Sequence, residues 1–427
     1  MQKELINTVE SFFNRITKAD FNIGTFINDF EQQVFIDYSF NREPNNSIKN
    51  ILITRMDAVG DYILTTPFIR GIRKNYPNAN IILVVSSLIY NLAKTNKYVD
   101  EVYIFDGSLN DRILEFTLIE ILQFCSKYIW FKDNKFRQID IAFSPQCGGD
   151  CIIPLLLSYF SGSPKRIGFG TAPYAALNLN IKKLTDENIG DILPNYFLDS
   201  FVLTDVVLLT KEEVHEVEKY TYLLKLLDLK LDNTDLELNI TNDDINNVKK
   251  YINPNKKNII VNIGSSQNRA IYDINKLNTA LKLIGDNNYI FIGGINDLDR
   301  MKNITIPHIN LVGRTTWRES AAIISLSDLY IGNDTGVMHM AAAFKIPILE
   351  ISREAKDKTY SLPKNYSSMH RFHPWNSKYI IVQPDHALDK CKDTFIYGGC
   401  ASFEAHCINQ IQPEEIAYAY KQLIKNL

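Results

Sequence analysis

The sequence predicts an α/β protein with two lobes, and three observations support this fold class. Helix-like and strand-like segments alternate from residue 51 to 143, as the βαβ units of a parallel sheet require. The same alternation restarts at residue 258 and continues to 350, after a polar stretch at 232–244. A chain of 427 residues is also too long for one ordinary core. We therefore expect two Rossmann-like domains that face a central cleft.

The elements follow from hydrophobic runs and their spacing. Short apolar runs predict strands, and amphipathic stretches between them predict helices. In the first lobe the strands are 51–53, 81–85, 102–105 and 139–143, and the helices are 61–76, 115–130 and 212–229. In the second lobe the strands are 258–263, 289–292, 329–331 and 346–350, and the helices are 275–285, 317–326 and 336–344. Pro413 at a helix start predicts one last helix. We therefore divide the chain into a helical extension (1–47), a first Rossmann-like domain (48–235), a second Rossmann-like domain (236–412) and a final helix (413–427).

Residues 1–47 form a predicted helical extension that precedes the first strand. Two apolar runs recur there at helical spacing, with several aromatic residues. This stripe fits packing on the main body or on another subunit, which would make it an oligomerisation element. Contact with a membrane surface is the alternative. Asp29 and Glu31, without a basic residue in that second run, disfavour anionic lipid.

Composition excludes several classes of protein. The net charge is -3, so a general nucleic-acid binder is not indicated. The start of the chain lacks the basic and apolar regions of a signal peptide. The longest apolar stretch, 152–160, is about half of what a membrane span needs. We expect a cytoplasmic protein without a transmembrane segment, with peripheral contact at the inner face of the membrane left open.

The sharpest phosphate-binding pattern is the strand-to-helix loop that ends at Gly336. Free N–H groups and the dipole of a helix that starts there favour a diphosphate, and a glycine lets it approach. Thr335 adds a hydroxyl donor. Asp334 has the same charge as a phosphate and is better suited to accept hydrogen bonds from sugar hydroxyls. His339 lies one turn later on the same helix face. The alternative is a capped helix followed by a packed histidine.

Two further strand ends of the second lobe carry similar loops. Ser265, Ser266 and Arg269 follow one strand, and hydroxyls with an arginine suit a phosphate. Gly293 follows the next strand, and Asp297 behind it is an acid that can bind ribose hydroxyls. The D-x-D pattern that starts at Asp297 is too common to indicate a metal. An exposed polar loop with a surface arginine is the alternative for the first of these loops.

In the first lobe, Asp61 follows the opening strand and begins the next helix. A carboxylate that faces the cleft there can act as a general base toward an attacking hydroxyl. The alternative is a helix-capping aspartate. The dinucleotide pattern G-x-G-x-x-G is absent from this loop.

These blocks together resemble glycosyltransferase family 9, the heptosyltransferase family of lipopolysaccharide core synthesis. The resemblance runs over roughly residues 48 to 427 and is carried by 51–67, 76–79, 98–102, 264–266, 327–343 and 411–416. It implies the GT-B architecture and an inverting, metal-independent transfer from a nucleotide-diphosphate sugar. Asp61 then matches the catalytic base, and the donor-site motif falls on Asp334, Thr335, Gly336 and His339. Arg269 stands near the family's phosphate-binding lysine. The final helix would cross back to the first lobe, whereas the extension 1–47 departs from typical members.

The resemblance points to ADP-heptose as donor, and to a lipopolysaccharide core, another surface glycan or a protein as acceptor. Some relatives that glycosylate autotransporters carry a cysteine-bound iron, which makes Cys391, Cys400 and Cys407 candidates for a structural iron or zinc site. Their spacing is not a compact zinc motif, and reduced thiols are the alternative. Two rival functions remain: a sugar-nucleotide epimerase or hydrolase, and a non-catalytic sugar-nucleotide-binding subunit.

Overall fold

The structure is a computed structural model, and it divides into two compact units. The first comprises Met1–Asp57, Tyr76–Ser87 and Val99–Leu209, and the second comprises Ala58–Asn75, Leu88–Tyr98 and Thr210–Leu427. The described residues are 47–106, 138–146, 154–155, 157–158, 161–169, 203–207, 215–225, 227–357, 367–388, 395–396, 399–400 and 404–427. The predicted extension, apart from Ser47, and the predicted helix 115–130 lie outside these ranges.

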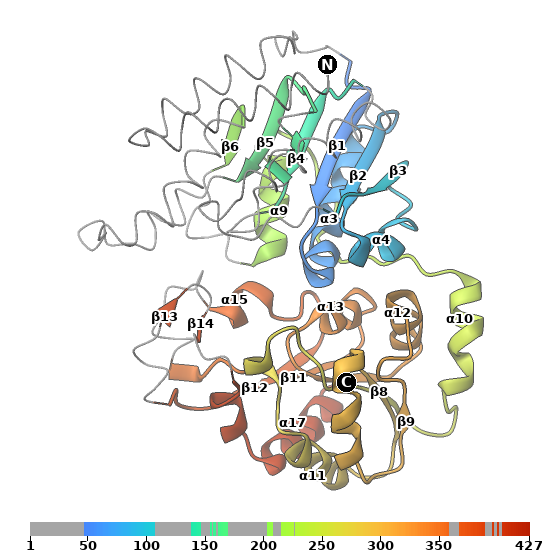
Figure 1. Ribbon diagram of the computed structural model, residues 1–427, viewed down its shortest axis with the longest axis vertical. Helices are drawn as coiled ribbons and strands as arrows, with labels where there is room; N and C mark the ends of the chain where they lie inside the picture. The colour runs from blue at the N-terminus through green and yellow to red at the C-terminus, as the bar shows by residue number, and fades with distance from the viewer. Residues whose placement is uncertain are drawn as a thin grey trace, which may run out of the picture. The chain divides into compact units, whose positions relative to one another are not determined.

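The first unit contains a six-stranded parallel sheet with the order β3-β2-β1-β4-β5-β6 (Figure 1). This is the strand order of a dinucleotide-binding Rossmann domain. Apolar residues fill β1 and β2 almost completely, which explains why both strands were visible in the sequence. The strands are β1 (Asn50–Arg55), β2 (Asn80–Val85), β3 (Glu101–Ile104), β4 (Ile141–Ser144), β5 (Lys165–Phe169) and β6 (Asp205–Val207).

The second unit contains another six-stranded parallel sheet, with the order β12-β11-β10-β7-β8-β9. Counted from β7, this is the same Rossmann order, so the predicted α/β class with two Rossmann-like sheets is confirmed. Its strands are β7 (Asn258–Asn262), β8 (Asn288–Ile292), β9 (Ile309–Asn310), β10 (Leu329–Gly332), β11 (Ile348–Ile351) and β12 (Tyr379–Val382). A short antiparallel pair, β13 (Phe395–Ile396) and β14 (Gly399–Cys400), follows.

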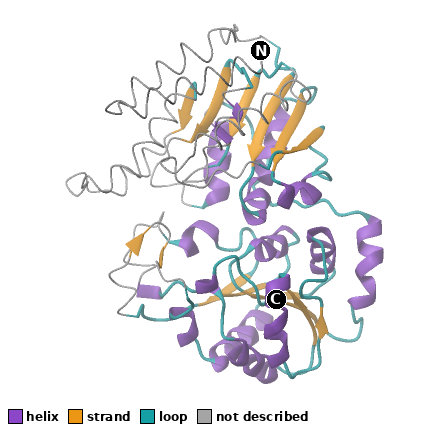
Figure 2. Cartoon of the chain, viewed as in Figure 1, coloured by secondary structure: helices purple, strands orange, loops and turns teal. Residues whose placement is uncertain are grey.

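Helices lie around the second sheet (Figure 2). Helix α3, from the first part of the chain, also belongs to this unit. The α-helices are α3 (Val59–Asn75), α4 (Ser87–Ala93), α9 (Glu216–Lys225), α10 (Asn242–Val248), α11 (Ile274–Ile284), α12 (Trp317–Ser325), α13 (Gly336–Ala343), α15 (Ser368–Phe372) and α17 (Pro413–Lys425). The 3-10 turns are Lys249–Tyr251, Asn268–Ala270, Ile295–Asn303 and Cys407–Gln410. Among the described residues, no helix is long and apolar enough to cross a membrane.

One face of the second sheet carries the core. Alternate residues of its strands pack there with α11 and α17, and these two helices lie side by side in Figure 1. The core strand residues include Ile259, Val261, Leu329, Ile331, Leu349 and Ile351. From α17 it takes Ile416, Ala419, Tyr420 and Leu423. The predicted last helix therefore exists from Pro413 onward, while its return to the first domain stays a prediction.

The N-termini of α3 and α13 meet within the second unit at two glycines. A Cβ added to Gly336 would lie 3.1 Å from the Gly60 nitrogen and 3.2 Å from the Val59 Cβ. A Cβ added to Gly60 would lie 2.8 Å from the His339 ring. These distances are shorter than ordinary Cβ contacts, so glycine at both positions allows the close approach without displacing the neighbouring atoms.

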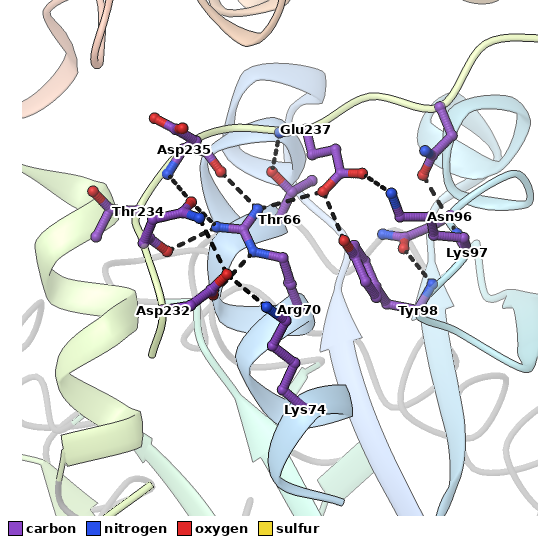
Figure 3. A network of polar contacts seen from close by, with 12 residues as sticks. Thr66, Arg70, Lys74, Asn96, Lys97, Tyr98, Asp232, Thr234, Asp235 and Glu237 are labelled. Carbon is purple, nitrogen blue, oxygen red and sulfur yellow. Dashed lines mark hydrogen bonds and ion pairs between the residues drawn. The ribbon is translucent and has the colours of Figure 1, made fainter. Parts of the chain in front are cut away.

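Helix α3 is tied to the segment 230–237, which precedes α10. The Arg70 side chain is 4% exposed and donates five hydrogen bonds to this segment (Figure 3). They reach Asp232, Asn233, Asp235 and Glu237. Trp375 donates to the Thr234 carbonyl oxygen at 2.8 Å, so the same segment is also held near β12. Arg70 thus fixes the helix that begins beside α13.

We predict that Arg70→Ala destabilises the protein by about 3 kcal/mol, because it removes a buried charge and leaves its acceptors without that partner. Lys74→Ala is the matched control. Lys74 also pairs with Asp232, at 2.6 Å, but its side chain is 49% exposed. Such a surface pair contributes about 0–1 kcal/mol. Urea unfolding of both variants tests this, and equal effects would contradict a dominant role for Arg70.

We also predict that Gly336→Ala lowers stability by about 1–3 kcal/mol, because overpacking forces the starts of α3 and α13 apart. Gly294→Ala is the control. Its φ of −74° suits any residue, and an added Cβ would be 3.6 Å from its nearest neighbour. Thermal unfolding measures both variants. A Gly336→Ala protein as stable as the control would show that the helix contact is not restrictive.

Candidate functional site

The loop between β10 and α13 leaves the start of α13 without a side-chain cap. Thr335 occupies the N-cap position, but its side chain makes no capping hydrogen bond. Its hydroxyl instead accepts a hydrogen bond from the Asn262 amide, at 3.0 Å, at the end of the neighbouring strand β7. The alternative of a helix capped by Thr335 is therefore wrong. The first N–H groups of α13 remain available to an anion.

The start of α3 adds a second positive helix end at the same place. The Gly60–Gly336 contact brings both helix N-termini together, and each carries the positive end of a macrodipole. Asp61 lies in the first turn of α3. The site thus combines a favourable position for an anion with a carboxylate that can accept a proton.

Several neighbouring groups shift the pKa of the Asp334 carboxyl group. Its side chain retains 30% of its accessible surface, yet burial by the surrounding protein is the largest cause that raises its pKa. The carboxylates of Asp61 and Glu354 raise this pKa further, whereas Arg353 and a 3.1 Å hydrogen bond from the Ser368 hydroxyl oppose the shift. Asp334 therefore lies in electrostatic contact with Asp61.

His339 is a buried, neutral neighbour of Asp334. Its Nε2 lies 3.7 Å from the Asp334 carboxylate, and its side chain is almost fully buried. Burial, reinforced by the positive charge that His373 can carry, lowers the pKa of His339 to about 3. Its Nδ1 has no hydrogen-bond partner within the part of the chain that the structure describes. The ring also packs against Gly60, so it contributes to packing as well as to the predicted sugar site.

The loop after β7 brings Ser265, Ser266 and Arg269 to the same edge of the sheet. The Ser265 hydroxyl accepts from the Gln267 amide N–H at 3.2 Å. The Gln267 side-chain oxygen accepts from Arg269, at 3.0 Å, and also from Arg353. Two arginines thus converge on one glutamine beside the loop between β10 and α13, which we call the donor loop because the sequence predicts a donor site there.

Arg353 was not among the site residues predicted from the sequence. It comes two residues after the end of β11, and β11 pairs directly with β10. The strand end itself was the available signal, because ligands bind at the carboxyl ends of parallel strands. No glycine or serine run marked this loop as it did the others.

Asp297 organises two of the predicted loops. Its carboxylate accepts a hydrogen bond from the Gly294 N–H at 3.0 Å and lies 3.4 Å from Arg300. The same carboxylate occupies the space that a side chain would need at Gly264, and it approaches Gly293. A side chain at Gly264 would therefore require the Asp297 carboxylate to move. Binding of ribose by Asp297 and Gly293 remains a prediction, since the observed partners of the carboxylate come from the protein.

The late cysteines lie only partly within the described residues. Cys407 is buried, and its Sγ lies 3.0 Å from the His406 Nδ1. Cys391 lies outside those residues, and for Cys400 only the backbone of β14 is described. Within the described ranges no three His, Cys, Asp or Glu side chains gather as a metal would need. A metal at these cysteines stays a prediction.

A cluster of aromatic and charged side chains near α15 was also not predicted from the sequence. His215 stacks against Trp375 with ring centroids 4.3 Å apart, and its Nε2 lies 3.0 Å from the His373 carbonyl oxygen. Burial lowers the pKa of His215 to about 3. Next to it, the buried Glu216 pairs with Lys219 and Arg371, at 2.7 and 2.8 Å. These residues come from distant segments, so spacing in the sequence could not bring them together.

Known proteins resemble this chain in sequence and in fold. Residues 199–394 match the model of glycosyltransferase family 9 (heptosyltransferase). Lipooligosaccharide heptosyltransferase 2 of Campylobacter jejuni is 28% identical over 127 residues, which are 30% of this chain and 35% of that protein. Lipopolysaccharide heptosyltransferase 1 of Campylobacter coli is 31% identical over 114 residues, 24% of this chain and 33% of that protein. The matches thus span about a third of the curated relatives' length.

Solved structures share the fold over most of the chain. A family 9 glycosyltransferase from Veillonella parvula superposes with a TM-score of 0.64 at 17% identity, and covers 91% of this chain and 100% of its own. The ADP-heptose lipopolysaccharide heptosyltransferase II of E. coli gives 0.60 at 17% identity, with 89% and 99% covered. E. coli heptosyltransferase WaaC, solved with ADP-2-deoxy-2-fluoro heptose, gives 0.56 at 12%, with 88% and 99% covered. The resemblance predicted from the motifs is thereby confirmed: the chain is similar to glycosyltransferase family 9 and has the GT-B fold of its solved members.

Proposed function

We propose that this protein transfers a sugar from a nucleotide diphosphate to a hydroxyl group, with inversion at the anomeric carbon. The observation that carries the proposal is the meeting of two helix N-termini at Gly60 and Gly336, with Asp61 and Asp334 beside them. An anion site next to a potential general base is what such a transfer requires.

The relatives support ADP-heptose as the donor. Two curated relatives are named as heptosyltransferases, and one structure of similar fold holds an ADP-heptose analogue. We propose a surface glycan, of the lipopolysaccharide core type, as the acceptor. The transfer would then take place on the cytoplasmic side of the membrane.

The step is a single displacement. Asp61 accepts the proton of the acceptor hydroxyl as its oxygen forms a bond to the anomeric carbon. The bond from that carbon to the diphosphate oxygen breaks at the same time, and the nucleoside diphosphate leaves with the electron pair. Attack from the face opposite the leaving group inverts the anomeric configuration.

Negative charge that develops on the leaving diphosphate needs stabilisation. The uncapped start of α13, the Thr335 hydroxyl and the arginines Arg269 and Arg353 can supply it without a metal ion. Asn262 orients the Thr335 side chain by donating to its oxygen, and the Thr335 hydroxyl keeps a proton that can point to the neighbouring Tyr330 or to a phosphate. His339 is held neutral, so the positive charge in this arrangement comes from the helix ends and the arginines.

We predict that Asp61→Asn lowers the transfer rate by about 10²–10⁴-fold, because the amide cannot accept the proton. Affinity for ADP should stay within about twofold of the wild type. Acceptor-dependent release of ADP from ADP-heptose measures the rate, and titration calorimetry measures the affinity. Asp299→Asn is the control, since Asp299 is exposed and pairs with Lys302 on the surface.

Full activity of Asp61→Asn would refute the base assignment. Equal ADP release with and without acceptor in the wild type would indicate a hydrolase. Tight binding of ADP-heptose without turnover would indicate a binding subunit.

We predict that Thr335→Val weakens ADP binding by about 3–10-fold, the size expected for one hydrogen bond of about 1 kcal/mol. The valine keeps the shape of the side chain but cannot donate to a phosphate. Thr279→Val is the control, because Thr279 lies on the exposed face of α11 and its hydroxyl donates only to the Asn275 carbonyl oxygen. Equal affinities in the two variants would remove Thr335 from the diphosphate site.

A further inference from the structure

Glu350 is a buried carboxyl group that the proposed transfer step does not use. It lies in the middle of the second sheet, on β11, and its side chain is 2% exposed. Its Oε2 has no hydrogen-bond partner among the residues that the structure describes. Burying a carboxyl oxygen without a hydrogen-bond partner is unfavourable, so the position needs an explanation.

The register of the sheet places Glu350 on the face of the donor loop. Its neighbours Leu349 and Ile351 point into the core on the other face, so Glu350 points away from that core. Glu350 is paired with Gly332 of β10, and Gly332 is paired in turn with Asn262 of β7. The three residues form one row across the strand ends, directly below the loop that carries Asp334.

Other polar groups of this layer have partners within the protein. Asn262 donates to Thr335 and to the Gly264 carbonyl oxygen. The Tyr330 hydroxyl donates to the Asn333 carbonyl oxygen at 2.8 Å. The Glu354 carboxylate accepts from the Ser367 hydroxyl and from the Met369 N–H. By contrast, the Glu350 Oε2 has no such partner among the described residues, so it is available to a ligand.

The surroundings of Glu350 favour its neutral form. Burial raises the pKa of Glu350 well above its usual range, and the carboxylates of Asp334 and Glu354 raise it further. Tyr330 faces it from β10 and Tyr379 from β12, both with raised pKa values, and α13 contributes the neutral His339. A neutral carboxylic acid is an O–H donor as well as an acceptor.

We propose that Glu350 is a specificity-determining residue whose carboxylic acid, together with the Asp334 carboxylate, binds one hydroxyl group of the donor sugar. The acid donates to the hydroxyl oxygen, and the hydroxyl donates to Asp334. This inference rests on the proposed function, because it assigns the sugar end of the same donor site. It predicts discrimination against donors that lack this hydroxyl, since the buried acid would then stay unpaired.

Binding of ADP and of ADP-heptose to matched variants tests the proposal. Glu350→Gln keeps a donor and an acceptor without charge, whereas Glu350→Leu removes both. We expect Glu350→Leu to bind ADP within twofold of the wild type and ADP-heptose about 10–100-fold more weakly, as the loss of a paired hydroxyl predicts. Glu350→Gln should stay within about threefold for both ligands. Glu414→Leu, at an exposed position of α17, should leave both affinities unchanged.

Several results would overturn the inference. Wild-type affinity of Glu350→Leu for ADP-heptose would do so, and so would an equal loss of ADP and ADP-heptose. A Glu350→Gln protein as weak as Glu350→Leu would mean that a charged carboxylate is needed. If the wild type binds neither ligand, the proposed donor itself is wrong; the first three results leave that donor intact.

The pH dependence gives a second readout that does not need the leucine variant to fold. Because the folded pKa of Glu350 is raised, its neutral form predominates below that pKa and is lost as the pH rises through it. The ratio of ADP-heptose to ADP affinity should therefore fall toward alkaline pH in the wild type and stay level in Glu350→Gln.

The stability of the folded protein should also decrease as the pH rises. The unfolded chain releases the Glu350 proton above about pH 4.5 while the folded chain keeps it, so the wild type loses stability as the pH rises. The melting temperature of Glu350→Gln relative to the wild type should then increase from pH 5 to pH 8. A constant difference, together with a level affinity ratio in the wild type, would show that Glu350 is ionised throughout.

Discussion

The candidate site depends on one steric constraint, the contact between Gly60 and Gly336. A Cβ on Gly336 would lie 3.1 Å from the Gly60 nitrogen and 3.2 Å from the Val59 Cβ, which is tighter than most Cβ contacts, so glycine suits this close approach. The contact has an electrostatic consequence, because two positive helix ends then act on the same small region. It also sets the distance from the first turn of α3 to the loop before α13, so Asp61 influences the ionisation of Asp334. The Arg70 network preserves this arrangement by fixing α3 to the segment 230–237.

The second sheet separates stability from chemistry by face and by strand end. Its apolar face packs on α11 and α17. On the opposite face the last residues of β7 and β10, and Glu350 near the end of β11, are polar or lack a side chain, and they support the donor loop from below. Asn262 fixes Thr335, and Tyr330 fixes the Asn333 carbonyl oxygen. The parallel arrangement therefore explains why so many polar side chains can be buried near one site without disrupting the core.

Much of the fold followed from the sequence because its central strands are continuous apolar runs. The predicted strands at 51–53 and 329–331 correspond to β1 and β10, and the helix predicted from 336 corresponds to α13. The strands β5, β6, β9 and β12 were not predicted. β6, β9 and β12 are edge strands of two to four residues, and β5 (Lys165–Phe169) begins with two basic residues, so none of them forms a long apolar run in the predicted pattern. Glycine and serine marked the loops after β7, β8 and β10.

The parts of the site that the sequence could not predict are those created by tertiary contact. Arg353 and Glu350 lie at or beside a strand end that has no glycine, and only the pairing of β11 with β10 brings them to the donor loop. His215 reaches the site region through contacts with residues more than 150 positions away. Asp297 shows the opposite case: the sequence placed it correctly at a strand end, but its partners are Gly294 and Arg300. Position followed from the pattern, whereas partners required the packed structure.

The proposed diphosphate would lie close to several acidic side chains. Asp61, Asp334 and Glu350 would together repel a diphosphate if all were charged. The structure reduces this repulsion by burial, which keeps Glu350 neutral and raises the pKa of Asp334. Positive charge comes from two helix ends and two arginines, and not from histidine, because burial also keeps His339 neutral. The site thereby retains oxygen atoms that can bind sugar hydroxyls, with Glu350 neutral in the proposed arrangement and Asp61 in the proposed role of proton acceptor.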